Sequence, residues 1–448
     1  MYFYLGGNKF MKITVIGAGY VGLVTSVCLA DLGNEVMCVK KSIDKLDELN
    51  KGMSPIYEPG LSEMLQKNLE EGRINFTNKM DEGVNFSEII FVCVGTPESK
   101  VGKADLSQVE EVSRQIAEEM DSYKLIIEKS TVPVNTHKLI KRTIKRYARN
   151  DLKFDIASNP EFLREGFAVY DFMNPDRIVV GVETKRAEEL FKEIYKPFID
   201  NGNVLFIRET AAAEIIKYAS NSFLAIKISY INMLSDLCER ADVDINMVAD
   251  GIGADKRIGR DFLNAGIGYG GSCLPKDVKA FINIAETFGV DFSLLKETEN
   301  ININRRRKFL EKVEDILWIT KNKIIAVWGL SFKPDTDDIR ETPSLAIVKG
   351  LLDDGAYLKL YDPEAMDNFK KLIPENGQIE YLEDKYDTLI DADALLIITE
   401  WDEFKTADMN KVRDLMKLPI IIDGRNIFEP ALMKDEGFEY YSIGRKIV

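Results

Sequence analysis

The sequence predicts two doubly wound α/β domains joined by a long helix and a helical central domain. Strand-like apolar runs alternate with helical patterns over residues 11–208, and the same alternation returns over 321–448. Between them, over 209–320, apolar residues recur at helical spacing. The length of 448 residues also exceeds what one ordinary hydrophobic core holds, so several domains are expected.

The first α/β domain, expected over 11–208, has the clearest series of strands. A parallel sheet is predicted because strand-like runs alternate with helical patterns, as in repeated β-α-β units. Met11 directly precedes the first strand, so residues 1–10 are interpreted as an N-terminal extension or as the product of an upstream start. The expected strands are, in chain order, KITVIG, EVMCV, EIIFVCVG, KLIIEKS, FDIASN and DRIVVGV.

The central and last domains follow a change of pattern near Glu209. A long helical stretch begins there and is expected to connect the two α/β domains. More helix is expected to about Lys321. The last domain, over 321–448, then has strand-like runs at KIIAVWGL, YLKLYDP, ADALLIITEW and LPIIIDGRN.

Charge and hydropathy restrict the classes of function. A formal net charge of -15 argues against a broad basic surface for nucleic acid, so an anionic substrate must be held locally. No apolar run approaches the roughly 20 residues that span a bilayer, and the first residues lack the features of a signal peptide. We therefore expect a cytoplasmic protein with neither nucleic-acid nor membrane partners.

Cysteine and histidine usage narrows the chemistry. The five cysteines are scattered and form no CxxC pair, which argues against a disulfide framework and a structural zinc site. His137 is the single histidine, so serine–histidine–acid hydrolysis and histidine-ligated metal chemistry are both disfavoured, and no metal is expected. A catalyst in this chain must use thiol, amine, carboxylate, hydroxyl or amide groups.

A glycine motif follows the first strand and opens a helical pattern, as a dinucleotide-binding Rossmann site requires. Gly17 permits the tight turn, Gly19 lets the backbone approach a pyrophosphate, and Gly22 lets the helix pack on the strand. The helix N-terminus then faces the phosphate anion. The motif predicts a nicotinamide dinucleotide site.

The end of the second strand bears on which dinucleotide is bound. An acidic residue there would bind the ribose 2′-hydroxyl of NAD, but EVMCV is followed by Lys40 and Lys41. A lysine pair at this place can instead accept the 2′-phosphate of NADP. The other interpretation is that both lysines are solvated and that Asp44 or another group serves the ribose.

The segment from Gly266 to Asp277 carries the strongest chemical signal. Its glycines form a loop, and Ser272, Cys273 and Pro275 read as the opening of a helix. A thiol at a helix N-terminus beside Lys276 is expected to have a lowered pKa, which makes cysteine a nucleophile. Asp277 lies on the same helical face. The other four cysteines occupy apolar contexts and are expected to be buried and inert.

The sequence resembles the UDP-glucose 6-dehydrogenase family, within the wider group of nucleotide-sugar 6-dehydrogenases. The resemblance runs from about Met11 to the C-terminus. It is carried by FVCVGTP at 91–97, KSTVPV at 129–134, SNPEFLREG at 158–166, KYASN at 217–221, RIG at 257–259, GYGGSCLPKD at 268–277, FKPDTDDIRETP at 332–343 and DGRN at 423–426.

The resemblance implies two successive oxidations of a primary alcohol, with the intermediate aldehyde held covalently on Cys273. Asp277 then assists proton transfer. Lys217 and Asn221, four apart on one helix, stabilise negative charge on the reacting oxygen. Glu161 and Thr131 position or activate water.

The resemblance also implies which residues line the cofactor and the sugar nucleotide, and that the enzyme is an obligate dimer in which Arg257 reaches the neighbouring site. The resemblance favours NAD as the cofactor, although at position 40 the family pattern has Asp whereas this chain has Lys. Beside the glycine motif, the cofactor residues are Val21, Lys40, Lys45, Thr96, Thr131, Glu165, Lys276 and Arg340. The substrate residues are Glu161, Phe162, Leu163, Arg164, Glu165, Lys217, Asn221, Arg257, Phe262, Leu263, Asn264, Ala265, Gly266, Gly270, Lys333 and Arg425.

Several alternatives remain open at this point. The stretch 163–181 resembles the UDP-glucose branch, whereas Leu274 resembles the GDP-mannose branch, and Asn135 replaces the usual glycine after KSTVPV. A single-step hydroxyacid dehydrogenase shares the Rossmann domain and the lysine–asparagine pair but needs no nucleophilic thiol. A non-catalytic nucleotide sensor is expected to lose Cys273, Lys217 or Asp277, and all three are present.

Overall fold

The computed structural model describes residues 11–97, 104–149, 152–207 and 209–447. Residues 1–10, interpreted above as an extension, lie outside the described residues. The chain forms two compact units that divide between Ala219 and Ser220, and each contains one β-sheet. The predicted class of two doubly wound α/β domains with a helical central region is confirmed.

The first unit is built on an eight-stranded sheet with the order β3-β2-β1-β4-β5-β6-β7-β8. Its core strands are buried on both faces, as expected for a sheet covered by helices. The strands are β1 (Lys12–Ile16), β2 (Glu35–Val39), β3 (Ile74–Thr77), β4 (Ile89–Val92), β5 (Lys124–Glu128), β6 (Phe154–Ser158), β7 (Ile178–Gly181) and β8 (Val204–Ile207).

One part of this sheet differs from the parallel sheet predicted from sequence. β6 and β7 pair antiparallel at Ser158 and Gly181, and β8 then pairs parallel to β7. The last two strands therefore run against the other six. The sequence pattern could not show this, because a strand's direction depends on whether its connection crosses over the sheet. The sequence analysis also missed β3 and β8.

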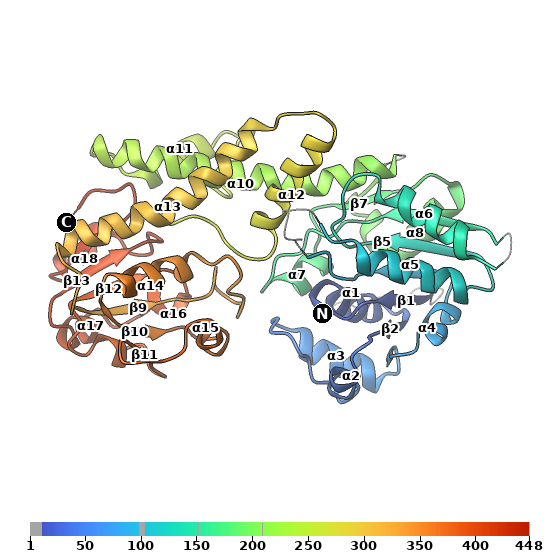
Figure 1. Ribbon diagram of the computed structural model, residues 1–448, viewed down its shortest axis with the longest axis horizontal. Helices are drawn as coiled ribbons and strands as arrows, with labels where there is room; N and C mark the ends of the chain where they lie inside the picture. Colours follow the sequence, from blue (N-terminus) through green and yellow to red (C-terminus); the bar gives the residue numbers. More distant parts are fainter. Residues whose placement is uncertain (1–10, 98–103, 150–151, 208, 448) are drawn as a thin grey trace. The chain divides into compact units, whose positions relative to one another are not determined.

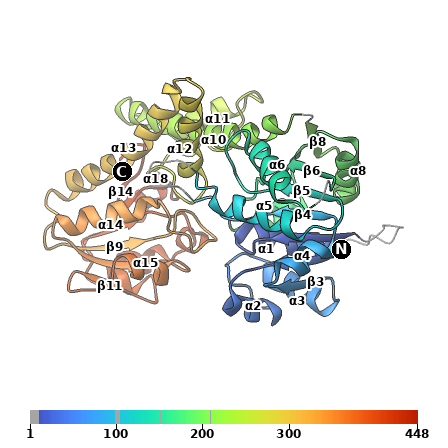
Figure 2. The ribbon, with the colours of Figure 1, turned by 45° about the vertical axis from the view of Figure 1, so that its right-hand side comes forward.

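Helices cover both faces of the first sheet. Ile13, Val15 and Phe91 pack into one layer with α1, α3, α7 and α8, whereas Ile16 and Ile90 pack with α4, α5 and α6. Figure 2 shows α5 and α6 side by side over the second face. The helices of this unit are α1 (Tyr20–Asp31), α2 (Ile43–Asn50), α3 (Leu61–Glu70), α4 (Met80–Phe86), α5 (Ser107–Glu119), α6 (Thr136–Tyr147), α7 (Ala168–Met173), α8 (Lys185–Ile194) and α9 (Lys196–Ile199).

The second unit contains a six-stranded parallel sheet with the order β11-β10-β9-β12-β13-β14. It repeats the 3-2-1-4-5-6 order of the first six strands of the other sheet. The sequence analysis missed β11 and β14, which lie at its two edges. The strands are β9 (Ile324–Trp328), β10 (Tyr357–Tyr361), β11 (Ile379–Tyr381), β12 (Ala394–Ile397), β13 (Ile420–Asp423) and β14 (Glu439–Tyr441).

Helices of the central region and of the last domain cover this second sheet. α13 and α14 pack side by side on one face through Phe309, Val313 and Ile347 (Figure 1). The long predicted helix is confirmed as α10, which has 31 residues. The helices are α10 (Thr210–Arg240), α11 (Ile245–Gly253), α12 (Leu274–Thr287), α13 (Ser293–Leu317), α14 (Pro343–Asp353), α15 (Met366–Leu372), α16 (Asp402–Lys405), α17 (Met409–Leu415), α18 (Pro430–Asp435) and the 3-10 turn Asp387–Leu389.

None of the helices in the described part of the chain combines the length and the apolar character needed to cross a membrane.

Candidate active site

The glycine motif of the first unit forms the turn between β1 and α1. Gly17 has a φ of 105° and donates its N–H to the carbonyl of Val39 at 2.9 Å. A Cβ on Gly17 would lie 2.5 Å from the Cys93 carbonyl oxygen, and one on Gly22 would lie 1.7 Å from the Gly17 carbonyl oxygen. A Cβ on Gly19 would meet nothing within 4 Å. Packing therefore requires Gly17 and Gly22, whereas Gly19 leaves open space at the N-terminus of α1.

This open turn fits a dinucleotide. α1 begins at Tyr20 with Gly19 as its N-cap, and no acidic side chain occupies its first turn. The first backbone N–H groups of a helix lack partners within the helix and carry partial positive charge, which suits a pyrophosphate. The half-buried Val21 lies in the same turn.

Lys40 turns toward the glycine motif from the end of β2. Its Nζ donates to the Ala18 carbonyl at 2.8 Å. Burial, and then the nearby ammonium of Lys45, lower the pKa of Lys40. The side chain of Lys45 is exposed. The position where an acidic residue would bind a ribose hydroxyl is thus occupied by a cation, with a second cation close by.

Two candidate threonines join the loops after β4 and β5. Thr96 Oγ1 donates to the Thr131 carbonyl at 2.8 Å. Ser130 Oγ donates to the Val94 carbonyl at the same distance and ties the two loops a second time. The carboxyl ends of parallel strands are where ligands bind in doubly wound sheets, so these loops belong to the same edge as the glycine motif.

Asn135, the departure from the family glycine, lies in this neighbourhood. Its φ is 72°, in the left-handed region that glycine adopts freely and that asparagine tolerates better than most residues. Its backbone N–H donates to Glu214 Oε2 at 2.6 Å. The substitution therefore keeps the backbone conformation that a glycine would supply.

Glu161 and Lys217 form a buried ion pair within the first unit. The Lys217 Nζ lies 2.8 Å from Glu161 Oε1, and both side chains are buried. The Leu163 N–H donates to the other carboxylate oxygen at 2.8 Å. Burial acts to raise the pKa of Glu161, but the Lys217 ammonium and these hydrogen bonds outweigh it and the pKa is lowered. Glu161 is therefore held as a carboxylate.

The rest of the segment from Phe162 to Glu165 lies nearer the surface. The Phe162 ring lies below the Arg177 guanidinium at 4.1 Å and near the Lys217 ammonium at 5.4 Å. Arg164 is exposed and holds Asp171 with two side-chain bonds of 2.9 and 2.6 Å. Leu163 and Glu165 are half-buried.

Sequence reasoning missed Glu58, which connects this segment to the glycine motif. Its carboxylate accepts hydrogen bonds from the Tyr20 hydroxyl, from the Gly166 N–H at 2.8 Å and from the Ala168 N–H at 2.7 Å. Glu58 is buried, with 6% of its surface exposed. No local pattern indicates this role, because Tyr20 lies 38 residues away along the chain and the two backbone donors lie more than 100 residues away.

In the second unit, Cys273 is the N-cap residue of α12, as the sequence predicted. Its side chain is half-buried and its sulfur lies 3.5 Å from Ser272 Oγ. Pro275 occupies the first turn of the helix, where its missing N–H costs nothing. A helix N-terminus favours an anionic sulfur.

The other four cysteines contrast with Cys273. All four are buried, as expected. Burial raises the pKa of Cys38 to about 11 and raises the pKa of the thiols of Cys28, Cys93 and Cys238 as well. These thiols are held protonated at neutral pH, so they are poor nucleophiles.

Asp277, one helical turn after Cys273, accepts hydrogen bonds from two side chains. The Asn221 amide donates to Asp277 Oδ2 at 2.6 Å, and Lys276 Nζ donates to Oδ1 at 2.7 Å. The Asp277 side chain is 1% exposed. The structure thus brings Asn221, Lys276 and Asp277 together beside the helix turn that carries Cys273.

The glycines before Cys273 serve internal packing. A Cβ on Gly270 would lie 2.5 Å from the Glu341 carbonyl oxygen, and one on Gly266 would lie 2.9 Å from that of Gly424. Leu263 and Ala265 are also buried. Phe262 has a φ of 63°, an uncommon conformation for a bulky residue. The segment is therefore closely packed against other parts of the second unit.

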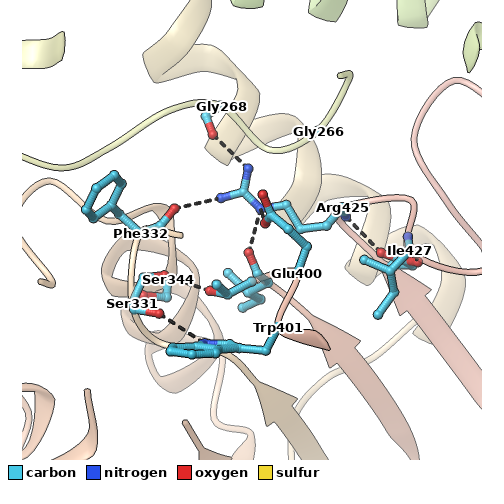
Figure 3. A network of polar contacts seen from close by, with 12 residues as sticks. Gly266, Gly268, Ser331, Phe332, Ser344, Glu400, Trp401, Arg425 and Ile427 are labelled. Carbon is cyan, nitrogen blue, oxygen red and sulfur yellow. Dashed lines mark hydrogen bonds and ion pairs between the residues drawn. The ribbon is translucent and has the colours of Figure 1, made fainter. Parts of the chain in front are cut away.

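Arg425 contacts this segment directly (Figure 3). Its guanidinium donates to the carbonyls of Gly268 at 3.1 Å, Ile398 at 2.7 Å and Phe332 at 3.4 Å. It also lies 3.3 Å from a carboxylate oxygen of Glu400, and 12% of its side chain is exposed. Predicted as a substrate residue, Arg425 in this structure holds three backbone segments of the protein together.

The remaining candidates in the second unit lie at the surface or near it. Arg257, with 89% of its side chain exposed, pairs with Asp255, and Arg340 pairs with Asp338. Asn264 is exposed and accepts a hydrogen bond from Arg260. The Lys333 ammonium lies 5.7 Å from the centre of the Phe332 ring.

Comparison with known proteins finds relatives over nearly the whole chain. Sequence profiles of the UDP-glucose/GDP-mannose dehydrogenase family match in order: the NAD binding domain over residues 11–199, the central domain over 211–304 and the UDP binding domain over 326–430. The UDP-glucose 6-dehydrogenase TuaD of Bacillus subtilis (strain 168) is 44% identical over 98% of this chain and 94% of its own length. The UDP-glucose 6-dehydrogenase of Rhizobium meliloti (strain 1021) is 45% identical over 97% of this chain and 100% of its own length.

A solved structure extends this similarity to the fold. The UDP-glucose dehydrogenase of the hyperthermophilic archaeon Pyrobaculum islandicum has a TM-score of 0.90 and 34% identity, covering 99% of this chain and 100% of that chain. The predicted resemblance and the predicted enzyme class, a dehydrogenase, are confirmed. With its glycine turn, its lysine–glutamate pair and the cysteine that opens α12, the chain belongs to the UDP-glucose/GDP-mannose dehydrogenase family.

Proposed function

We propose that this chain oxidises the C6 alcohol of UDP-glucose to the carboxylate of UDP-glucuronate in two successive oxidations. The observation that carries the mechanism is Cys273: of the five cysteines, all of which lie in described segments, it alone is not fully buried, and it opens a helix beside Asp277. The similarity to UDP-glucose 6-dehydrogenases over 94% or more of their length supports the substrate.

The proposed reaction passes through two covalent intermediates on Cys273. NAD, when bound, accepts one hydride in each oxidation. Removal of the first hydride and a proton from the C6 alcohol gives an aldehyde, and the Cys273 sulfur adds to C6 to form a thiohemiacetal. Loss of the second hydride from C6 and of the hydroxyl proton gives a thioester, and water then cleaves the C–S bond. The acid leaves and the thiol is restored, so the aldehyde stays attached to the protein between the oxidations.

Each remaining catalytic candidate has a role suited to its side chain. Lys217 and Asn221 stabilise the negative charge that develops on the reacting oxygen, since an ammonium and an amide both donate hydrogen bonds. Asp277 assists proton transfer near the thiol. Glu161, held as a carboxylate by Lys217, orients the hydrolytic water together with Thr131.

The dinucleotide site uses the open glycine turn, and NAD is the acceptor we favour. Gly17, Gly19 and Gly22 form the turn, and Val21, Thr96, Thr131, Glu165, Lys276 and Arg340 line the cofactor. NADP is the alternative, supported by the contact of Lys40 with the glycine turn and by its neighbour Lys45. Sugar-nucleotide contacts come from the segments Glu161–Glu165 and Phe262–Gly266 and from Arg257, Gly270, Lys333 and Arg425.

A cytoplasmic homodimer is the state in which we expect the enzyme to act. Phe223, Tyr230, Met233 and Leu237 follow one another on α10 at intervals of seven, three and four residues, and each is 54–63% exposed. Such spacing places them on one face of the helix, where a second copy of the chain would cover them. The exposed Arg257 would then reach the partner's site. Residues 11–208, 209–320 and 321–448 serve as the dinucleotide, dimerisation and UDP-sugar domains.

Two other activities compete with this assignment. GDP-mannose or another nucleotide sugar would undergo the same chemistry, and the half-buried Leu274 beside Cys273 is the position that favours this alternative. A single-step hydroxyacid dehydrogenase would not need Cys273. A side-by-side assay of UDP-glucose, UDP-N-acetyl sugars and GDP-mannose, each with NAD and NADP, separates these activities and the two cofactors.

The mechanism itself is tested by stoichiometry and by one substitution. Purified enzyme is expected to reduce about two equivalents of dinucleotide per UDP-glucose, as the two hydride transfers require. Cys273→Ala is expected to abolish acid production, and Cys238→Ala, which removes a buried thiol, to leave it unchanged. One equivalent with release of aldehyde, or normal acid production by Cys273→Ala, would exclude the covalent route.

A further inference from the structure

Tyr269, four residues before Cys273, is held by a single side chain through both of its backbone polar groups. Its N–H donates to Asn302 Oδ1 at 2.8 Å, and its carbonyl accepts from Asn302 Nδ2 at 3.1 Å. Asn302 lies in α13 and is 2% exposed. One amide thus pairs with the loop as a neighbouring strand would, since an amide offers a donor and an acceptor side by side.

The same side chain explains one glycine of the segment. Gly268 has a φ of 97°, and a Cβ built on it would lie 2.5 Å from Asn302 Oδ1. Asn302 therefore occupies the space that any other residue at 268 would need. The conformation of the loop and the position of the amide depend on each other.

Arg306, one helical turn after Asn302, strengthens the hold on Tyr269. Its Nη2 donates to the Tyr269 carbonyl at 3.3 Å and to the Glu341 carbonyl at 3.0 Å. The Tyr269 ring is buried with Val278 of α12 and Leu295 of α13. Ring and backbone are fixed together, so Tyr269 is an anchor for the chain that follows it.

Only Gly270, Gly271 and Ser272 separate this anchor from the thiol. The Gly271 N–H donates to the Arg340 carbonyl at 2.8 Å, and on the other side of Cys273 the helix α12 begins at once. The Cys273 backbone is thus fixed from both ends. A change in the position of Tyr269 would be transmitted to the sulfur over three residues.

We propose that Asn302 is a positioning residue, which fixes the backbone at Tyr269 and so sets the direction from which the Cys273 sulfur meets the reacting carbon. The inference rests on the proposed covalent role of Cys273. Covalent capture demands alignment of the sulfur with an aldehyde carbon, and small displacements of a reacting group have large effects on rate.

The position requires the amide of asparagine, which donates to the Tyr269 carbonyl and accepts from its N–H. Asn302→Asp keeps the size but places two acceptors against the Tyr269 carbonyl and N–H, so one pairing becomes repulsive. Asn302→Ala removes both bonds, so the buried Tyr269 N–H is left unsatisfied and its carbonyl keeps only Arg306. Asn304, exposed on the same helix, offers a matched control as Asn304→Asp.

The experiment measures the thiol directly in the full-length enzyme. Alkylation of Cys273 by iodoacetamide is followed as a function of pH, with the modified peptide identified by mass spectrometry, alongside kcat and the KM values for UDP-glucose and NAD. For Asn302→Asp we expect alkylation of Cys273 and kcat each to fall about tenfold, because the sulfur is displaced. Both KM values should stay within about twofold. Asn304→Asp should behave as wild type.

If Asn302→Asp and Asn302→Ala do not fold, the substitution Arg306→Lys tests the same positioning role. Arg306→Lys retains the charge, but its Nζ ends one atom short of the position of Nη2, so both carbonyl bonds should weaken and alkylation and kcat should fall by a smaller factor. Wild-type alkylation rates in the folded variants would overturn the proposal. A rise in both KM values with unchanged alkylation would also overturn it, since this indicates general loosening.

The result for Asn302 can be separated from the proposed function. If Cys273→Ala still produces acid, the covalent mechanism fails and the positioning role fails with it. If Cys273→Ala is inactive while Asn302→Asp keeps wild-type alkylation and kcat, the mechanism stands and only the positioning role is excluded.

Discussion

The two sheets have the same turn after their first strand but different residues after their second strand. After β1, Gly17 donates its N–H to the carbonyl of Val39 at 2.9 Å, and after β9, Gly329 donates to Tyr361 at the same distance. Both glycines have a φ near 100°, at 105° and 99°. The residue that follows the second strand is Lys40 in one unit and Asp362 in the other.

This one position changes what each turn can bind. Asp362 accepts from the backbone N–H groups of Leu330 and Ser331 at 2.6 and 3.0 Å, so a carboxylate already fills the place where N–H groups would meet a phosphate. Lys40 instead contacts a carbonyl, and Gly19 leaves open space before α1. The same turn thus leaves open space beside a helix N-terminus in the first unit and forms an internally satisfied loop in the second.

The largest expected effect concerns the glycines of the first turn. Gly22→Ala places a Cβ 1.7 Å from the Gly17 carbonyl oxygen, so we expect loss of folded, cofactor-binding enzyme. Gly19→Ala meets no atom, so stability should stay within about 0.5 kcal/mol while the KM for NAD rises about tenfold. Thermal melting and steady-state kinetics measure both. A wild-type KM for NAD in Gly19→Ala would show that Gly19 does not contact the cofactor.

The next effect tests the internal role of Asp362. Its carboxylate also accepts from the N–H groups of Glu364 and Ala365 and from the Trp401 indole. Asp362→Asn should lower the free energy of unfolding by about 3 kcal/mol, because buried donors lose a charged acceptor. The KM for NAD should not change. Urea denaturation measures this loss of stability, and the exposed Asp414→Asn is a control that should stay near wild type. A change in the KM for NAD would show that Asp362 also affects the dinucleotide site.

An effect that is smaller per pH unit arises from a buried carboxyl of the first unit that is less well satisfied than Asp362. Glu128 Oε1 accepts from Ser130, but Oε2 has no hydrogen-bond partner within the described residues, and burial raises the pKa of Glu128 to about 8. The folded chain keeps this proton between about pH 4.3 and pH 8, where an unfolded carboxyl has lost it. Folding stability should therefore decrease as pH rises through this window, by about 1.4 kcal/mol per pH unit.

Glu128→Gln removes that titration while preserving shape. Relative to wild type, the variant should become progressively more stable from pH 5 to pH 8, as measured by urea denaturation at each pH. The exposed Glu70→Gln should follow the wild-type profile. Parallel profiles for wild type and Glu128→Gln would show that Glu128 does not retain its proton.

The smallest expected effect concerns cofactor preference. Lys40→Asp restores the residue type that binds a ribose hydroxyl and repels a 2′-phosphate, so the ratio of kcat/KM for NAD over NADP should rise about tenfold. Lys41→Asp, which breaks an exposed pair with Glu111, should change the ratio little. An unchanged ratio in Lys40→Asp would show that Lys40 does not contact the ribose end of the cofactor.

Local patterns in the sequence predicted much of the fold and the centre of the candidate site. The glycine turn, the strands buried on both faces and the helix that begins after Cys273 depend on residues a few positions apart, whose spacing is visible in the chain. Edge strands such as β3, β8, β11 and β14 were missed, because short strands at sheet edges carry weaker apolar patterns.

The remaining features depend on pairings between distant parts of the chain. The reversal of β7 and β8 depends on how a connection runs over the sheet, and Glu58 caps a helix more than 100 residues away. Asn302 holds Tyr269 across 33 residues, and Arg425 holds Gly268 across 157. The sequence by itself therefore indicated which residues are candidates for the chemistry, because reactive groups and turns follow local rules. Tertiary structure alone decided which side chains fix them in place, since hydrogen bonds over such separations exist only once the chain has folded.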